Sequence, residues 1–357
     1  MSAMAQMQRD HHEAETRLRR VDAARAVADR KRQAAAEVAT ITELVSTLAL
    51  GGSPGALGEA AAQLARLTQW RTSARDALAA ATVDSRSGGA RSGGIEVLLR
   101  VVADVRGSGE DAVYQSLLTL EQMLRRAPTR VAVGEAGIDA MMAASGAASP
   151  STRCTVAGTA AVWAASHDAS NEEVLLRRRW HLELVGRAMA VAPIAGLRRL
   201  LPILPRGGRE GKAEKVENTD HHTGDDTTAD AEYLVPVVPI VGALWSMANR
   251  LERWDGMLPH QQAGPGQQQP RQAAAAGAAA AREFVEWAAV LVQASDALKS
   301  RRRNQRLFLP ALGLLHCIAA NPAWRPLLLI NGGSLSGELR QLLEKCAAGG
   351  GGAIARE

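Results

Sequence analysis

Aromatic residues are scarce in this chain: they make up 3% of its 357 residues, although apolar residues make up 46%. The interior must therefore be built mainly from Ala, Leu and Val, which allow helices to pack closely. The three cysteines, Cys154, Cys317 and Cys346, stand too far apart for a zinc site or a disulfide framework. This usage indicates a reducing compartment, so we expect the protein to be cytoplasmic or nuclear.

Targeting and membrane segments are also missing from the sequence. Its N-terminal region has no apolar core of about 7–15 residues, as a signal peptide would, and its basic residues alternate with Asp and Glu, unlike those of a mitochondrial presequence. No apolar run approaches the roughly 20 residues of a membrane span. The net charge of +5 combines both signs. It favours acidic partners without requiring nucleic acid, and no transmembrane segment is expected.

Motifs for catalysis or for a bound cofactor are weak. The stretch 107–112 (GSGEDA) resembles a dinucleotide loop, but no βαβ unit surrounds it, so a turn between helices is the better interpretation. The stretch 333–337 (GSLSG) misses the nucleophile elbow by one position. His221 and His222 lie beside acidic residues in a polar run, where a metal would bind weakly and unselectively. We therefore predict no enzymatic activity, no cofactor and no metal.

What the chain does contain is a recurring helical pattern. Residues 240–249 (IVGALWSMAN) follow Pro239 and place apolar residues on one face of a helix. Four other segments align with this one and are spaced by 56, 42, 82 and 71 residues, which gives a base period near 42 with insertions. The equivalent anchor positions are Leu64, Leu120, Val162, Leu244 and Leu315.

Glycine breaks followed by apolar helices recur between these anchors, at Gly93-Gly94, at Gly137 and at Gly332-Gly333. The pattern resembles the armadillo repeat, with the HEAT repeat as the nearest alternative. The resemblance covers roughly residues 41–346, and the stretch 311–335 is its clearest unit. It implies an all-α fold, an α-solenoid of about five repeats in which each anchor lies on the third helix of its repeat.

Composition divides the chain into an N-terminal helix, repeats and two insertions. Residues 8–38 are polar nearly all round, which predicts a solvated helix or a weak coiled coil. Residues 87–94 (SGGARSGG) are expected to be a flexible break. The predicted segments are 1–40 for the N-terminal polar helix, 41–205 for repeats 1–3 and the start of repeat 4, 206–231 for a disordered insertion, 232–258 for the rest of repeat 4, 259–281 for a Gln/Pro/Ala-rich insertion, 282–347 for the last repeats, and 348–357 for a flexible tail.

The resemblance also points to a binding groove. Armadillo proteins of the importin-α kind bind extended peptides through a Trp and an Asn four residues later on each third helix. The corresponding pairs here are Ala62/Arg66, Leu118/Gln122, Ala160/Ala164, Gly242/Ser246 and Gly313/Cys317. The Trp–Asn ladder is therefore absent, and the small residues indicate a shallow groove that accepts a helix or bulky side chains.

The function implied by this resemblance is that of a non-catalytic scaffold or adaptor. It would bind an extended or helical protein segment of acidic character along the groove. Arginine clusters at 66–75, 125–126, 177–179, 198–199 and 301–306 keep open an alternative, the binding of nucleic acid or another anionic surface. The candidate partner-binding residues are Arg66, Gln122, Arg125, Arg126, Trp163, His167, Trp245, Ser246, Asn249 and His316.

Overall fold

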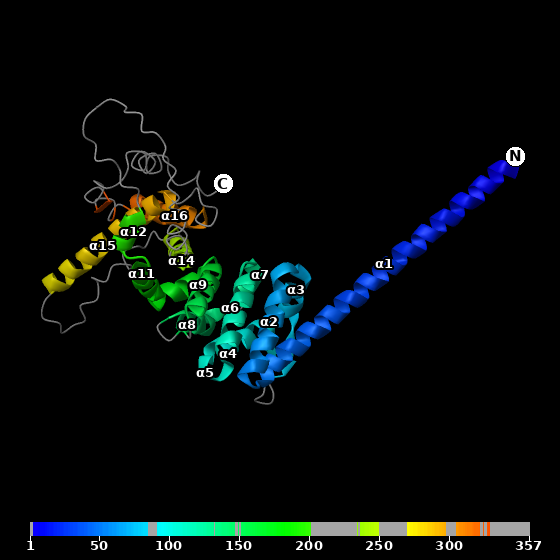
Figure 1. Cartoon of the computed structure of the whole chain (residues 1–357), viewed down its shortest axis with the longest axis horizontal. Helices are drawn as coiled ribbons and strands as arrows, with labels where there is room; N and C mark the ends of the chain where they lie inside the picture. The colour runs from blue at the N-terminus through cyan, green and yellow to red at the C-terminus, as the bar shows by residue number, and fades with distance from the viewer. Residues whose placement is uncertain are drawn as a thin grey trace, which may run out of the picture. The chain divides into compact units, whose positions relative to one another are not determined.

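The computed structural model is almost entirely helical (Figure 1), which confirms the predicted all-α class apart from one short β-ribbon. It describes residues 3–84, 91–131, 133–146, 149, 151–200, 234, 236–249, 270–297, 305–321, 324 and 327–328. The contacts among the elements divide the chain into two compact units, Met1–Val133 and Gly134–Glu357. The insertion predicted at 206–231 and the tail at 348–357 lie outside the described residues.

The first unit contains α1 to α7 and the ribbon. Its elements are α1 (Ala3–Leu50), α2 (Pro54–Trp70), α3 (Thr72–Ala80), β1 (Thr82–Asp84), β2 (Arg91–Gly93), α4 (Gly94–Ala103), α5 (Val105–Ser108), α6 (Glu110–Leu124) and α7 (Ala127–Arg130). The described helices of the second unit are α8 (Gly134–Ser145), α9 (Thr152–Ala165), α10 (Ala169–Arg177), α11 (Trp180–Val191), α12 (Ile194–Leu200), α14 (Val237–Asn249), α15 (Pro270–Ala297) and α16 (Gln305–Ala320).

Helix α1 is continuous over 48 residues, whereas the sequence analysis placed a boundary near residue 40. The stretch between Ala3 and Leu50 has no Gly or Pro to interrupt the helix, which ends at Gly51 in a left-handed conformation with φ of 72°. Its last turns bury Ile41 and Val45 against the neighbouring helices, while the earlier part of the helix extends away from the rest of its unit (Figure 1).

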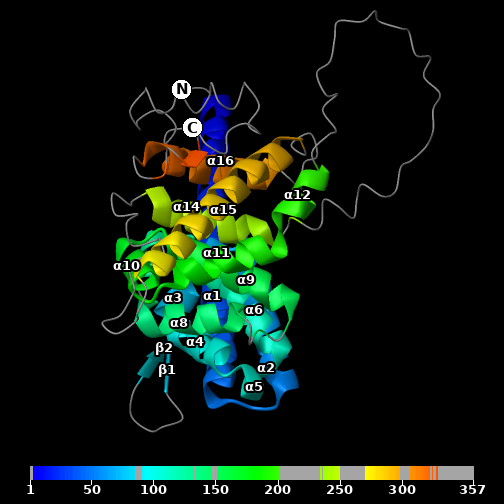
Figure 2. The same ribbon diagram turned by 90° about the vertical axis from the view of Figure 1, so that its left-hand side faces the viewer.

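The ribbon formed by β1 and β2 includes residues 91–93 of the flexible break expected at residues 87–94, and residues 87–90 lie outside the described residues. The two strands are antiparallel, with Val83 paired to Ser92, and both of these side chains are buried. Figure 2 shows the two short arrows side by side next to α4. Gly94, which follows β2 directly, begins α4 against the C-terminal end of α3, where a Cβ would lie 2.4 Å from the carbonyl oxygen of Leu78. Glycine is therefore required where the ribbon turns into the helix.

The five anchor positions are all fully buried, as the alignment of repeats predicts. They lie on α2, α6, α9, α14 and α16, which are the helices that the sequence analysis assigned as third helices. Within the first unit α2 packs on α6, and within the second α14 packs on both α9 and α16. The anchors are Leu64, Leu120, Val162, Leu244 and Leu315.

A second repeated feature caps three of these helices at their C-terminal ends. In each case a side chain of the following helix donates to the last carbonyl oxygens, which have no partner inside their own helix. The capping residues are Arg75 on α3, Arg130 on α7 and Asn171 on α10. Arg75 donates to the carbonyls of Thr68 and Gln69 at 2.6 and 3.0 Å, Arg130 to those of Leu124 and Arg125 at 2.7 and 2.8 Å, and Asn171 to that of Ala165 at 3.2 Å.

Polar contacts connect α8 to the two helices that follow α9. Arg177 and Arg178 reach Glu135 at 2.5 and 2.7 Å, and the indole nitrogen of Trp180 donates to Asp139 at 2.9 Å. Each of these pairs joins residues 41 to 43 positions apart in the sequence, close to the predicted period of 42. Two of the three arginines in the cluster at 177–179 are thus already engaged in ion pairs within the fold.

Helix α15 begins at Pro270, inside the stretch that was predicted to be a low-complexity insertion, residues 259–281. Its alanine-rich sequence has the highest intrinsic helix propensity, which favours a helix although the composition is repetitive. Further along α15, Trp287 is fully buried and donates to the carbonyl of Ala192 at 2.8 Å. Phe284 contacts both Trp287 and Trp324, with ring centroids 5.9 Å apart in each case.

Candidate partner-binding surface

The exposed side of α2 carries the clearest candidate for a partner contact. Arg66 is exposed and Ala62 half-buried, as expected for the groove positions of the first repeat. One turn beyond Arg66, the side chain of Trp70 is 81% exposed. Trp70 is not among the residues predicted from the sequence, although its distance of four residues from Arg66 places both on the same side of the helix.

Helix α6 presents the equivalent side next to α2. Gln122 and Leu118 are both half-buried, so the predicted pair of groove positions is accessible here too. Arg125 is exposed and pairs with Glu121 at 2.6 Å, while Arg126 pairs with Asp76 of α3. These two arginines therefore already have carboxylate partners, whereas Arg66 has none among the residues that the structure describes.

Trp163 of α9 packs against the next third helix, α14, and contributes less to an open groove. A Cβ placed on Gly242 of α14 would lie 2.3 Å from Cε2 of the Trp163 ring. The ring is half-buried in the space that this glycine leaves open. The interpretation of Gly242 as part of an unfilled shallow groove therefore needs correction, because the chain fills this space itself.

Trp245 repeats the same relationship on the next pair of helices. A Cβ placed on Gly313 of α16 would lie 2.3 Å from both Cε2 and Nε1 of the Trp245 ring. Trp163 and Trp245 each follow an anchor by one residue, and Gly242 and Gly313 each precede an anchor by two. The two pairs of consecutive third helices in this unit, α9 with α14 and α14 with α16, therefore pack in the same way: a Trp ring on the first helix lies over a glycine on the second.

The remaining candidates of the second unit are accessible to different degrees. His167 is exposed, and its Nδ1 lies 2.8 Å from the carbonyl oxygen of Trp163. Ser246 and His316 are half-buried, and His316 follows the anchor of α16 as the two tryptophans follow theirs. Asn249 is the last residue of α14, and its side chain lies outside the described part of the chain.

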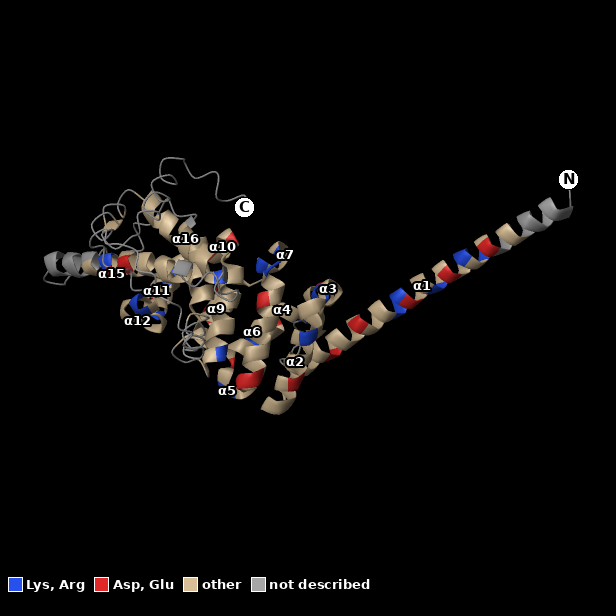
Figure 3. Ribbon diagram, turned by 45° about the horizontal axis from the view of Figure 1, so that its top comes forward, with Lys and Arg blue, Asp and Glu red and all other residues tan. Residues whose placement is uncertain are grey.

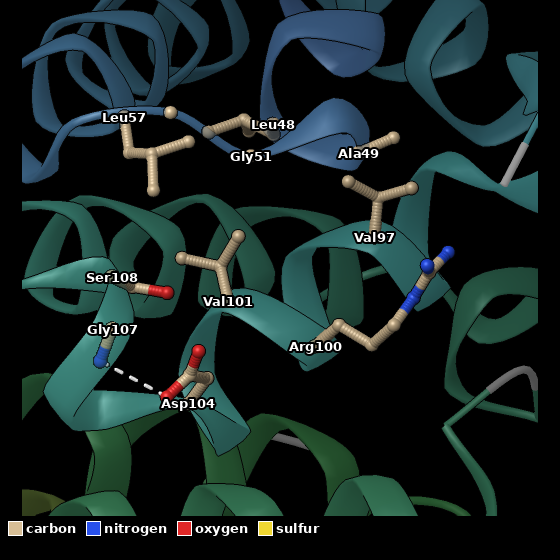
Figure 4. Close-up of a pocket in the computed structure, with 11 residues that line it drawn as sticks. Leu48, Ala49, Gly51, Leu57, Val97, Arg100, Val101, Asp104, Gly107 and Ser108 are labelled. Carbon is tan, nitrogen blue, oxygen red and sulfur yellow. Dashed lines mark hydrogen bonds between the residues drawn. The ribbon is translucent and has the colours of Figure 1, made fainter. Parts of the chain in front are cut away.

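A cavity of about 430 Å³ lies in the first unit, between the end of α1, the start of α2, and α4 and α5 (Figure 4). Its walls include Leu48, Leu57 and Val101, and two charged residues lie at its edge. Asp104 accepts a hydrogen bond from the backbone N–H of Gly107 at 3.0 Å and so caps α5. The stretch around Gly107, which resembled a dinucleotide loop in the sequence, forms this short helix and the turn that follows it.

Groups suited to catalysis do not converge in the part of the chain that is described. No cluster of three or more His, Cys, Asp or Glu side chains occurs among those residues. Burial raises the pKa of the Cys317 thiol to about 12, so the thiol stays protonated and a poor nucleophile at neutral pH. Among the described helices, none is both long enough and apolar enough to cross a lipid bilayer.

Comparisons with known proteins add little to this geometry. No known family's sequence model matches the chain, and no curated protein matches it. Among solved structures, an engineered protein from the Northeast Structural Genomics Consortium is similar at 14% sequence identity, over 86% of this chain and 95% of that one, with a TM-score of 0.49. A similarity at this level carries no argument about fold or function.

Proposed function

We propose that this chain is a non-catalytic interaction scaffold, an armadillo-like α-solenoid that binds a protein segment along its third helices. Three features support a repeated architecture: the burial of all five anchors, the packing of α2 on α6 and of α14 on α9 and α16, and the caps supplied by the helices that follow α2, α6 and α9. Repeats that stack on their neighbours leave one side of every third helix open, which suits the binding of an extended segment.

The single observation that carries the proposal is the exposure of Trp70 at the end of α2. Trp and Arg dominate the binding energy of protein interfaces, and a Trp this exposed has apolar area to bury against a partner. Arg66 lies one turn earlier on the same side of the helix and has no carboxylate partner among the described residues. A segment with an apolar anchor for Trp70 and an acidic side chain for Arg66 fits this pair.

Helix α6 supplies the next contact along this surface. Gln122 is half-buried and its amide can both donate and accept, which suits the backbone of an extended segment. The alternative function, nucleic-acid binding through the arginine clusters, has less support, because Arg125, Arg126, Arg177 and Arg178 pair with acidic side chains of the chain itself. A protein partner is therefore the better proposal for the third helices.

Selection from a peptide library displayed on phage tests this proposal. The selected peptides should contain an apolar residue near an Asp or Glu, and Trp70→Ala should weaken their binding by at least about 30-fold, the effect of losing a hot-spot residue of roughly 2 kcal/mol. Val131→Ala is the control, since Val131 is a large apolar residue of the same unit that is 66% exposed and belongs to neither α2 nor α6. Equal binding by the two variants, or no selectable peptide, would contradict the proposal.

A further inference from the structure

The excess positive charge of this chain lies in one exposed stretch of α1, residues 17–32. The stretch holds seven of the 42 basic residues and two of the 37 acidic ones, which leaves 35 of each sign in the rest of the chain. Every residue in it is exposed except the half-buried Ala28. Figure 3 shows basic and acidic residues interspersed along α1, which extends away from the other elements of its unit.

Several of these charges have no partner within the fold. Arg20, Arg25, Arg30 and Lys31 form no ion pair with any residue that the structure describes. This differs from the arginine clusters near the third helices, which are mostly paired or used as caps. Unpaired, exposed cations on one helix create a local positive field that attracts an anionic ligand.

The acidic residues of this part of α1 lie along one side of the helix, whereas its basic residues lie on both flanks of that side and on the side away from it. Successive residues of an α-helix are about 100° apart, so residues seven apart lie nearly above one another. Glu15, Asp22 and Asp29 follow this spacing and form an acidic stripe along one side. The two ion pairs given by the structure, Arg19 with Glu15 at 2.6 Å and Arg32 with Asp29 at 3.9 Å, both involve this stripe.

One side of this part of α1 carries no acidic residue and combines small residues with basic edges. Val21, Ala24 and Ala28 lie along its centre, with spacings of three and four residues. The basic residues next to this centre lie on its two edges, which are formed by Arg20 with Lys31 and by Arg25 with Arg32. The second edge borders the acidic stripe, and Arg32 lies 3.9 Å from Asp29 there. We call this side the basic face of α1.

We propose that the basic face of α1 binds duplex DNA in the major groove, mainly through the phosphates. An α-helix with its side chains is about 10–12 Å wide, and the major groove of B-DNA is about 12 Å wide. A helix in the groove brings its two basic edges to the two phosphate backbones, while the central Ala and Val residues approach the base edges and the thymine methyl groups. The acidic stripe then lies outside the groove, beyond the edge formed by Arg25 and Arg32.

Other anionic partners fit the basic face less well. A second copy of the helix would bring like charges together, and a membrane surface would gain little because the centre offers only Val, Ala and the charged Arg17. Helical RNA has a deep, narrow major groove that does not admit side chains. An acidic protein helix would bury little apolar area against alanines, whereas DNA carries about one charge per 1.7 Å of its axis.

Fluorescence anisotropy with a labelled 20-base-pair duplex of arbitrary sequence, added to the full chain over a series of salt concentrations, tests this inference. We expect binding that weakens steeply with salt, because each phosphate contact contributes about −0.9 to the slope of log K against log salt. The double variant Arg20→Gln/Arg25→Gln should weaken binding at least tenfold and reduce the slope by about two. Gln and Arg have similar helix propensities, so α1 should keep its helicity by circular dichroism.

The matched control removes two charges from the other side of the same helix, Arg19→Gln/Arg30→Gln. We expect this control to change the affinity for DNA less than threefold. Comparing the two double variants then distinguishes binding by the basic face from attraction by the overall charge of the helix. Equal losses in both variants would overturn the inference. So would stronger binding to polyglutamate or to vesicles with anionic lipid than to DNA, or an absence of DNA binding at low salt. None of these results bears on the proposed function, which uses α2 and α6.

Discussion

The ring of Trp163 on α9 occupies the space that a side chain on Gly242 of α14 would need, since a Cβ there would lie 2.3 Å from the ring. Gly242→Ala must therefore displace the ring or separate the two helices, and we expect a loss of about 1–3 kcal/mol in the free energy of unfolding. Gly186→Ala is the control: Gly186 is an exposed residue of α11 whose added methyl meets no atom within 4 Å. It should be neutral or stabilising by up to about 1 kcal/mol in urea unfolding.

A double-mutant cycle tests whether the clash is with this ring. Trp163→Ala creates the space that the new methyl group needs, so adding Gly242→Ala to it should cost less than adding Gly242→Ala to the natural sequence. We expect a coupling free energy of about 1–2 kcal/mol from the four urea unfolding curves. Additive effects of the two substitutions would mean that the ring does not fill the space above Gly242.

The stacking of third helices predicts how damage spreads from a buried anchor. Leu244→Ala should cost about 2–5 kcal/mol, because it removes a fully buried side chain and leaves a cavity. In a solenoid each repeat depends on its neighbours, so amide hydrogen exchange should become faster in α9 and α16 as well as in α14. Leu309→Ala, at a residue that is 65% exposed, should stay within about 0.5 kcal/mol of the natural protein. Faster exchange confined to α14 would argue against stacking.

Arg75 should contribute to stability through its cap on α2. Its guanidinium donates to two carbonyls at 2.6 and 3.0 Å, which would otherwise lack partners at the helix end. Arg75→Ala should cost about 1–2 kcal/mol in thermal or urea unfolding. Arg66→Ala, on the exposed side of α2, should change stability by less than about 0.5 kcal/mol. Similar effects of both substitutions on stability would show that Arg75 does not stabilise the protein by capping α2.

Much of the helical framework could be predicted from the sequence. The anchors were found because apolar residues at helical spacing mark a buried face, and Pro239 and Gly51 mark a helix start and a helix end by local backbone chemistry. The ribbon of β1 and β2 could not be predicted, because strands of three residues are too short to show a period. The first turns of α15 were missed for a different reason. Repetitive, alanine-rich composition occurs both in disordered segments and in helices, so composition alone could not distinguish the two.

The candidate surface was predicted less completely than the fold. Arg66 and Gln122 lie at accessible positions as expected, because their distance from the anchors places them on the open side of the helix. The contacts of Trp163 and Trp245 with glycines on other helices depend on which helices become neighbours, and this is set by packing over long sequence distances. Trp70 was missed because it follows the repeat pattern at the very end of α2, where a helix and its connection cannot be told apart in sequence.

The buried thiol of Cys317 gives a pH-dependent test of the packing of α16. Burial raises its pKa from 9.0 to about 12, so the folded state favours the neutral thiol. This contribution to stability is fully present below pH 9 and is lost as the pH rises towards 12. We therefore expect the stability difference between the natural protein and Cys317→Ala to shrink by about 1–2 kcal/mol between pH 7 and 10.5. A constant difference would mean that the thiol is not buried.

The central claim is that a partner segment binds the open side of the third helices at Trp70, while Trp163 and Trp245 serve the packing between helices. Indole N–H resonances of the seven tryptophans, assigned by single Trp→Phe variants, test it directly during titration with a peptide selected from the library. The account predicts that the Trp70 resonance shifts and saturates with the binding curve, whereas those of Trp163 and Trp245 stay in place. A stationary Trp70 resonance together with shifts at Trp163 and Trp245 would contradict it.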